Sequence, residues 1–255
     1  MTKPITVKNL VLGQGMPKIC VPLTGADREA LLEEAKEAKA AGAELVEWRA
    51  DFYEQLFEEE CVRKLFGELS DILGQIPLIF TLRTKKEGGN CQIRTEDYVN
   101  CLLAAAKSGC ADLVDVEAFG EEAAKKELIA ELHKSGVFVI ASSHDFEKTE
   151  DREALLARFC QLDETGADIL KMAVMPHTFD DTAALMQATA EMTKRTHRPL
   201  VSMAMGNLGS MSRIAGENFG SAITFATVGA ASAPGQFPIK ELRMMMKALH
   251  GKNCK

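Results

Sequence analysis

The sequence predicts an α/β fold of the (β/α)8 barrel type, in which eight parallel strands form a closed ring inside a ring of helices. Three observations predict it. Short apolar, β-rich runs alternate with stretches of helical period, and eight such pairs follow one another along the chain of 255 residues. Glycines end five of the helical stretches, where a left-handed residue commonly closes a helix. No Pro/Ser-rich linker divides the chain, so we expect residues 1–255 to form one domain.

The elements can be assigned in chain order. The first four pairs have strands at 18–23, 43–51, 77–83 and 111–118 and helices at 26–42, 57–74, 94–109 and 121–136. The last four have strands at 137–145, 167–174, 199–205 and 221–229 and helices at 150–166, 179–195, 212–220 and 238–251. The glycines that we expect to end helices are Gly42, Gly74, Gly109, Gly136 and Gly166. An open doubly wound sheet is the alternative, but it would more often have fewer repeats and a glycine-rich first turn.

A short segment precedes the first pair. Residues 5–13, with the sequence ITVKNLVLG, contain two apolar runs separated by Lys8 and Asn9. Two residues between short strands are the usual spacing of a β-hairpin turn. We therefore expect a hairpin that closes the bottom of the barrel.

The composition argues against two classes of protein. A net charge of −7 is unlike that of a nucleic-acid-binding protein, which needs a basic surface to neutralise phosphates. An anionic small-molecule substrate would therefore need a local group of cations. Residues 218–239 carry no charge over the length of a membrane span, but they include Gln236, Pro234 and Pro238, so we expect no membrane segment.

The cysteines and the N-terminus indicate the compartment. The seven cysteines are an odd set without a C-x-x-C pair or zinc-like spacing, as expected of reduced thiols inside the cell. The first residues contain no apolar run long enough for a signal peptide. We therefore expect a cytoplasmic protein.

Ionisable side chains interrupt the predicted strands, although parallel barrel strands are buried on both faces. A period of two places Glu47, Arg49 and Asp51 on one face of the second strand. The same alternation pairs Thr81 with Arg83, Asp115 with Glu117, and Ser142 with His144, while Lys171 lies within the sixth strand. Most of these residues lie near the C-terminal ends of their strands, where barrel enzymes build their active sites. The residues that we expect to converge there on one pocket are Glu47, Arg49, Arg83, His144 and Lys171.

Lys171 has the most specific chemistry in this set. Its neighbours in sequence are apolar and Arg49 and Arg83 are expected nearby, so desolvation and like charge should lower the pKa of its amine. A neutral amine is the nucleophile that a Schiff base with a ketone requires. His144 would then shuttle the proton. Glu87, in the loop after the third strand, could orient the imidazole, but without further information a solvated loop acid is the better interpretation. The alternatives are a lysine that extends to water, a histidine satisfied in the core, and structural ion pairs without chemistry.

Six motifs, in this order, resemble the type I 3-dehydroquinate dehydratase family, the lyases of the shikimate pathway of aromatic amino-acid biosynthesis. They are EWRAD (47–51), FTLRTKKEGG (80–89), SSHDFEKT (142–149), ADILKMAVMP (167–176), SMAMGNLGSMSR (202–213) and SAPGQ (232–236). The match runs from the hairpin to the last helix, and the order and spacing of the motifs make it specific. Pro22 and Ser143 depart from the residues that some members carry at these positions.

The resemblance implies a (β/α)8 barrel that dehydrates 3-dehydroquinate to 3-dehydroshikimate, by syn elimination of water through a lysine Schiff base. It implies that Lys171 forms the imine, that His144 is the general base and acid, and that Glu87 tunes His144. By the same resemblance, Arg213 would hold the substrate carboxylate. The other implied substrate contacts are Glu47, Arg49 and Arg83 at the ring hydroxyls, Ser232 and Gln236 on a closing loop, and Met203, Met205 and Phe225 in the pocket wall. The family also suggests a homodimer, and the mechanism needs no metal or cofactor.

Two other functions fit parts of the sequence. A class I aldolase also uses a strand lysine, but it would need a phosphate cradle near the last two strands. Residues 206–210 could form a weak one, although the neighbouring Arg213 better suits a carboxylate. A catalytically dead barrel that serves as a binding module would be expected to lack Lys171 or His144, and both are present.

Overall fold

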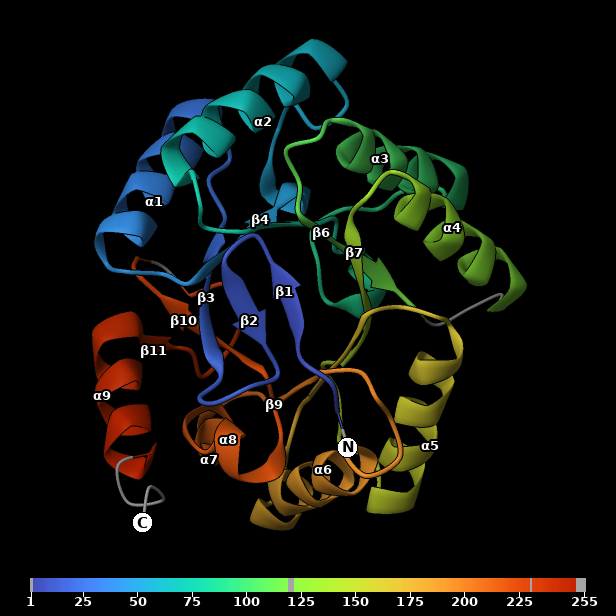
Figure 1. The fold of residues 1–255 in the computed structure, drawn as a ribbon, viewed down its shortest axis with the longest axis vertical. Coiled ribbons are helices and arrows are strands. Elements are labelled where there is room, and N and C mark those ends of the chain that lie inside the picture. Colours follow the sequence, from blue (N-terminus) through green and yellow to red (C-terminus); the bar gives the residue numbers. More distant parts are fainter. Residues whose placement is uncertain (1, 119–121, 230, 251–255) are drawn as a thin grey trace.

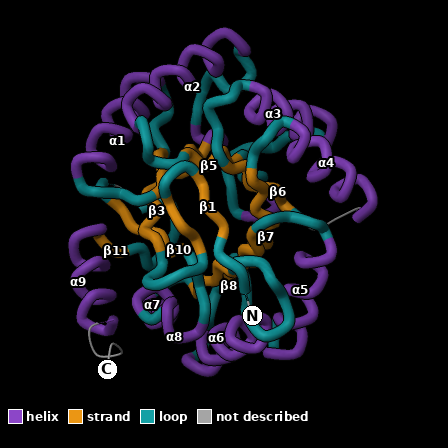
Figure 2. The backbone as a smooth tube through the Cα atoms, in the orientation of Figure 1, coloured by secondary structure: helices purple, strands orange, loops and turns teal. Residues whose placement is uncertain are grey.

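Eight parallel strands form a closed ring inside the helices in the computed structural model, which describes residues 2–118, 122–229 and 231–250 (Figures 1 and 2). The ring consists of β3 (Lys18–Leu23), β4 (Leu45–Arg49), β5 (Leu78–Thr81), β6 (Leu113–Glu117), β7 (Phe138–Asp145), β8 (Ile169–Val174), β9 (Leu200–Ala204) and β10 (Ile223–Thr227). Neighbours in the chain pair in parallel from β3 to β9, and β10 pairs with β3. The ring closes where Leu200 bridges Ser221 and accepts a hydrogen bond of 2.7 Å from the backbone N–H of Ala222. The predicted barrel is confirmed.

Helices cover the outside of the ring. They are α1 (Arg28–Ala40), α2 (Glu59–Leu73), α3 (Thr95–Lys107), α4 (Glu122–Lys134), α5 (Arg152–Glu164), α6 (Phe179–Met192), α7 (Ser210–Ile214), α8 (Gly216–Phe219) and α9 (Ile239–His250). Side chains fix several starts: Asp27 and Asp151 each accept a hydrogen bond from a backbone N–H of the first turn, and Thr178 forms a capping box with Asp181. All five glycines predicted to end helices have positive φ angles, between 60° and 88°.

The seventh helical segment differs from the prediction of one helix at 212–220. It forms two short helices, α7 and α8, that meet at Ala215, whose backbone is not helical. A Cβ at Gly216 would lie 2.9 Å from the ring of Pro17, so the chain approaches Pro17 too closely for a larger residue. Gly216 therefore permits the close approach of α8 to Pro17, a contact that the periodicity of the sequence did not single out.

The hairpin closes the bottom of the barrel as predicted. Strands β1 (Ile5–Val7) and β2 (Leu10–Leu12) pair in antiparallel register around Lys8 and Asn9, and Figure 1 shows them in front of the ring. Val7 and Leu12 are buried against the lowest layer of the barrel interior. That layer consists of Cys20, Leu45, Ile79, Leu113, Ile140, Ile169, Val201 and Ile223.

The interior changes from apolar to charged along the barrel axis, which positions the site. The pleat points every second side chain inward, so the next inward layer lies about 6.6 Å further along each strand. Its polar members are Glu47, Thr81, Asp115, Ser142 and Lys171, and all are buried. Between strands and helices lies an apolar layer, in which the ring of Trp48 lies 4.8 Å from Phe66 and 5.5 Å from Phe80. None of the helices in the described ranges is long and apolar enough to cross a membrane.

Candidate active site

A pocket at the C-terminal ends of the strands brings together every residue that the sequence analysis placed in the site. It is lined by Glu47, Arg49, Arg83, Glu87, His144, Lys171, Met203, Met205, Arg213, Phe225, Ser232 and Gln236, together with Phe146, Ala173 and Ala233. The members come from five strands of the ring, β4, β7, β8, β9 and β10, and from the segments that follow β5, β7, β9 and β10. The predicted convergence therefore follows from strand alternation and from the common direction of the strands.

Lys171 projects from the middle of β8 into this pocket and is buried. Its Nζ donates hydrogen bonds to Glu47 Oε1 (3.2 Å) and to Asp115 Oδ2 (3.0 Å). The nitrogen also lies 4.8 Å from the centre of the Phe225 ring, within the range of a cation–π contact. Two carboxylates and an aromatic face thus fix the position of the amine.

The expectation that the pKa of Lys171 is lowered is wrong. Burial alone would lower that pKa, but the carboxylates of Asp115 and Glu47 outweigh burial and raise it above its ordinary value. The sequence pattern identified the two arginines as neighbours, whereas the groups that touch the nitrogen are acids on β4 and β6. Lys171 is therefore an ammonium in the resting protein, and its proton must move before the amine can attack a carbonyl.

His144 and Glu87 form a hydrogen-bonded pair at the pocket wall. The imidazole Nδ1 lies 2.9 Å from Glu87 Oε2, which also accepts a bond of 3.2 Å from the backbone N–H of His144. Burial, and then the charges of Arg83 and Lys171, hold the pKa of His144 well below its usual value. Burial raises the pKa of Glu87 to about 8. The imidazole is thus neutral at physiological pH, and Nε2 is the nitrogen left to exchange a proton with a ligand.

The loop that carries Glu87 is held close to β5 by glycine. A Cβ at Gly89 would lie 2.1 Å from the backbone oxygen of Arg83, and one at Gly88 would lie 2.3 Å from the Phe146 ring. Gly88 also has a φ of +78°, a left-handed conformation that glycine adopts without strain. The sequence GG after Glu87 is therefore a packing requirement that turns the carboxylate back toward the pocket.

Arg83 organises the floor of the site through buried carboxylates. Its guanidinium donates to Asp115 Oδ1 at 2.7 Å, to Glu117 Oε1 at 3.2 Å and to Glu87 Oε2 at 3.4 Å. Arg49 instead makes a two-pronged pair with Asp51, both bonds being 2.8 Å. Arg83 therefore sets the positions of three acids.

Asp115 contacts Lys171, and Glu117 shares Arg83 with it behind the pocket, although neither had an expected role. Their alternation on the fourth strand was the available signal, because a carboxylate pair inside a barrel strand needs buried partners. Glu117 also accepts bonds from the Thr84 backbone and hydroxyl, at 2.7 and 2.8 Å. Ser143, the departure noted above, lies outside the pocket, since Arg158 on α5 donates to its hydroxyl at 3.5 Å.

Arg213, on α7, is the buried cation of the pocket without a carboxylate bonded to it among the residues that the structure describes. It donates one hydrogen bond, from Nη2 to the Pro234 carbonyl oxygen at 3.0 Å. Within the described ranges its Nε and Nη1 have no hydrogen-bond partner. Burial lowers the pKa of Arg213 to about 10, so the guanidinium is still charged at neutral pH. A buried, charged fork with two unused donors is suited to bind a carboxylate.

The segment after β10 covers the pocket. Ser232 and Gln236 bond to each other, with the amide Nε2 of Gln236 donating to the Ser232 hydroxyl at 3.0 Å. The pocket has a volume of only about 50 Å³, whereas pockets for small ligands commonly measure about 300 Å³ or more. We therefore expect this segment to move when a ring-sized ligand binds.

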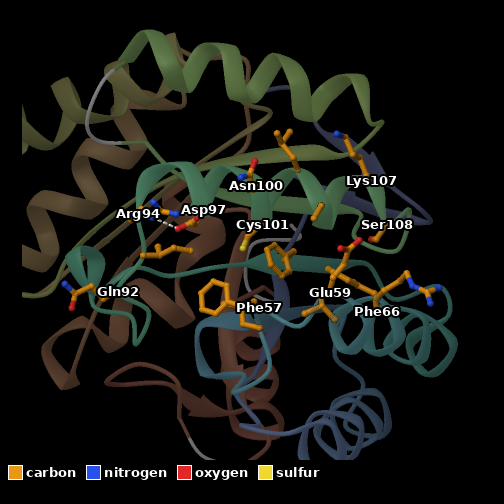
Figure 3. A pocket seen from close by; sticks show the side chains of 17 residues that line it. Phe57, Glu59, Phe66, Gln92, Arg94, Asp97, Asn100, Cys101, Lys107 and Ser108 are labelled. Atoms are coloured by element: carbon orange, nitrogen blue, oxygen red, sulfur yellow. Dashed lines mark hydrogen bonds and ion pairs between the residues drawn. The ribbon is translucent and has the colours of Figure 1, made fainter.

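A larger groove of about 930 Å³ lies on the outer surface between α2 and α3 (Figure 3). Phe66 and Phe80 contribute to its lining from the buried layer, and Phe57 is exposed beside them. It contains none of the residues of the predicted site. Buried titratable groups locate the chemistry more reliably than volume does, so the pocket inside the barrel is the candidate active site. In the part of the chain that the structure describes, no three His, Cys, Asp or Glu side chains are grouped to hold a metal ion.

Comparison with known proteins gives one family. The model of the type I 3-dehydroquinase family matches residues 19–253. A 3-dehydroquinate dehydratase of Clostridium kluyveri is 42% identical over 247 residues, which cover 96% of this chain and 97% of that one. The crystal structure of type I 3-dehydroquinate dehydratase from Clostridium difficile with covalently modified comenic acid has a TM-score of 0.95 and 40% identity, over 99% of this chain and 100% of that one. A 3-dehydroquinate dehydratase from Geobacillus kaustophilus superposes with a TM-score of 0.95 at 38% identity, over 99% of this chain and 98% of that one.

Proposed function

This chain belongs to the type I 3-dehydroquinase family and is a hydro-lyase that converts 3-dehydroquinate into 3-dehydroshikimate, and from that premise we propose the residues that carry out each step. Lys171 forms the imine with the substrate ketone, His144 moves the protons, and Glu87 orients His144. The observation that supports this assignment is the convergence in one pocket of a buried lysine, a histidine bonded to Glu87, and the guanidinium of Arg213, two of whose donors have no partner in the described ranges.

The imine makes an otherwise difficult proton removal feasible. A proton beside a ketone is weakly acidic, whereas a protonated imine accepts the electron pair left by that proton. His144 takes the C2 proton to give an enamine, and the enamine then expels the C1 hydroxyl. The same imidazole returns its proton to the departing oxygen, so the proton and the hydroxyl leave from one face. Water hydrolyses the product imine and restores Lys171.

The remaining pocket residues bind the substrate. Arg213 pairs with the substrate carboxylate through Nε and Nη1, the two donors without partners among the described residues. Glu47, Arg49 and Arg83 face the ring hydroxyls or support the groups that do. Ser232 and Gln236 exchange their mutual hydrogen bond for bonds to the ligand when the segment closes. Met203, Met205 and Phe225 form the apolar wall.

Two variants separate the roles of lysine and histidine. Lys171→Ala removes the imine and should abolish dehydration. His144→Ala keeps the amine, so we expect it to accumulate the substrate imine while turnover falls by about 10²–10⁴-fold. Product formation is followed by the absorbance of the new conjugated double bond, and intact-protein mass after borohydride treatment reports the imine. Rapid turnover by either variant would refute the assignment.

Three further properties belong to the proposal. Residues 1–255 form a single domain, the protein is cytoplasmic, and it assembles as a homodimer, as the family resemblance suggests. Light scattering coupled to size-exclusion chromatography measures the assembly directly. A mass near 56 kDa, twice the 27.8 kDa of the chain, is expected, and a mass near 28 kDa would contradict the dimer.

A further inference from the structure

Asp115 contacts the reacting nitrogen, yet the steps described so far give it no part. Its Oδ2 lies 3.0 Å from Lys171 Nζ, and the residue is 1% exposed. It comes from β6, two strands from β8 in the ring. Burying an ionised carboxylate so deeply costs more free energy of desolvation than an ordinary hydrogen bond returns, so the charge must be compensated by opposite charges.

The two oxygens of Asp115 have different partners. Oδ1 accepts hydrogen bonds from Arg83 Nη2 at 2.7 Å and from the Ser142 hydroxyl at 2.6 Å, and Oδ2 faces Lys171. Glu47, the other acid at the nitrogen, receives a bond of 2.9 Å from the uncharged Thr81 hydroxyl. Asp115 is thus the carboxylate that a fixed cation keeps both anionic and immobile.

We propose that Asp115 is the permanent counter-ion of the reacting nitrogen, holding Lys171 in place as an ammonium before the reaction and keeping the imine protonated after it. This inference rests on the proposed role of Lys171 as the imine-forming residue. Asp115 touches the nitrogen and exchanges no proton with the substrate. Its role is to match one positive charge at one position throughout the cycle.

The chemistry of imine formation conserves that charge. An ammonium and a ketone give a protonated imine and water, so the C=O bond breaks and a C=N bond forms. Of the three protons on the ammonium, two leave with the oxygen as water and one stays on the nitrogen. No external acid, base or oxidant is needed, and the positive charge remains beside Asp115. The cost of the arrangement is a slower first step, because the ammonium must first give a proton to the neutral imidazole of His144, which returns it to the oxygen that leaves as water.

Among the other charged or titratable groups near Lys171, Glu47 is the second acid bonded to the nitrogen in the described ranges, and it is held by the Thr81 hydroxyl rather than by an arginine. Those facing the nitrogen or lining its pocket are Cys20 on β3, Glu47 and Arg49 on β4, Arg83 and Glu87 after β5, His144 on β7 and Arg213 on α7. The arginines repel a cation, and His144 is neutral. Burial alone would raise the pKa of Asp115, but Arg83 and Lys171 hold it below its usual range. Asp115 is therefore ionised across the working pH range.

The first measurement is the pH dependence of imine formation. The enzyme is mixed with 3-dehydroquinate, quenched with borohydride at set times, and the adduct on the Lys171 peptide is quantified by mass spectrometry. Asp115→Asn should move the acid limb of this rate to lower pH by about 1–3 units, the usual effect of one opposite charge at such a distance. The matched control is Glu117→Gln, which removes an acid from the same strand and the same arginine without touching Lys171. In Glu117→Gln the acid limb of the rate of imine formation should stay at the wild-type pH.

The second measurement separates a counter-ion from a structural residue. At a pH above the pKa of the imine, where imine formation is complete, Asp115→Asn should eliminate water about tenfold more slowly for each unit by which that pKa falls, because the protonated fraction of the imine falls in proportion. Faster imine formation at low pH with slower elimination is a pattern that general damage to the site would not give. Ser142→Ala provides a milder variant if Asp115→Asn does not fold. It leaves Oδ1 with one donor fewer, so the limb should move to higher pH.

Three results would count against these ideas in different ways. The counter-ion proposal would be overturned if the acid limb of imine formation does not move in Asp115→Asn, or if it moves equally in Glu117→Gln. Elimination at the wild-type rate would do the same. A wild-type enzyme with no adduct on Lys171 would instead overturn the proposed function, and the two failures are therefore distinguishable.

Discussion

Removal of the Arg213 guanidinium should lower kcat/KM for 3-dehydroquinate, because this guanidinium is proposed to bind the substrate carboxylate. The side chain is 1% exposed, and two of its nitrogens have no hydrogen-bond partner in the described ranges. In the complex these donors would form a buried, two-pronged pair, and breaking a buried pair from one side costs about 3–5 kcal/mol. Arg213→Gln should therefore lower kcat/KM by about 10²–10⁴-fold. Arg213→Lys keeps the charge but loses the fork, about 1.5–3 kcal/mol, and should lower it by about 10–150-fold.

The assay compares 3-dehydroquinate with an analogue whose carboxylate is replaced by the neutral carboxamide. If Arg213 binds the carboxylate, the wild type should discriminate strongly between them and Arg213→Gln should not, which forms a double-mutant cycle. Arg243→Ala is a matched control, because Arg243 donates to the backbone of Ala41 and Gly42 outside the pocket. Equal losses for acid and amide in Arg213→Gln would refute the reasoning, because they would show that the guanidinium supports the fold rather than the carboxylate.

Three more predictions concern the Glu87–His144 pair, the loop that carries Glu87, and the segment after β10 that covers the pocket. The folded state retains a proton on Glu87 between its ordinary pKa of 4.5 and about 8, so its contribution to stability should be lost as pH rises through that window. Glu87→Gln should therefore reduce the fall in urea midpoint between pH 5 and pH 8. If the variant keeps the wild-type dependence of the midpoint on pH, that dependence comes from other groups. Gly89→Ala should lower the free energy of unfolding by about 1–3 kcal/mol, because the added Cβ would clash with the backbone of Arg83. The control is Gly67→Ala, in open space on α2, which should raise it by up to about 1 kcal/mol. Similar shifts of the urea midpoint in the two variants would contradict the close approach of Gly89 to Arg83. Product should slow protease cleavage around residues 228–236, and equal cleavage would argue against a moving cover.

The sequence was sufficient for the barrel and for most of the residues that line the pocket. Strand periodicity alone placed Glu47, Arg49, His144 and Lys171 on inward faces, and parallel strands carry such residues to one end. Glu87 required the family resemblance, because a loop acid has no periodicity that fixes its direction. The pattern could not show that Gly89 turns this loop back toward the pocket.

The sequence was insufficient for the pairing of charges inside the ring. Asp115 on β6 contacts Lys171 on β8, two strands away in the ring and 56 positions away in the chain. The inward layer contains cations and acids, and the pKa of Lys171 depends on which of them touch it. The local environment predicted a lowered pKa, and the ring of strands supplies two acids that reverse it.

The central claim is that Lys171 forms a covalent imine with the substrate in this pocket. The most direct test is borohydride reduction of the wild-type enzyme in the presence of 3-dehydroquinate, followed by mapping of the modified peptide. The account predicts one stable adduct, on the peptide that contains Lys171, and none in Lys171→Ala. An adduct on another lysine, or full activity without any adduct, would contradict it.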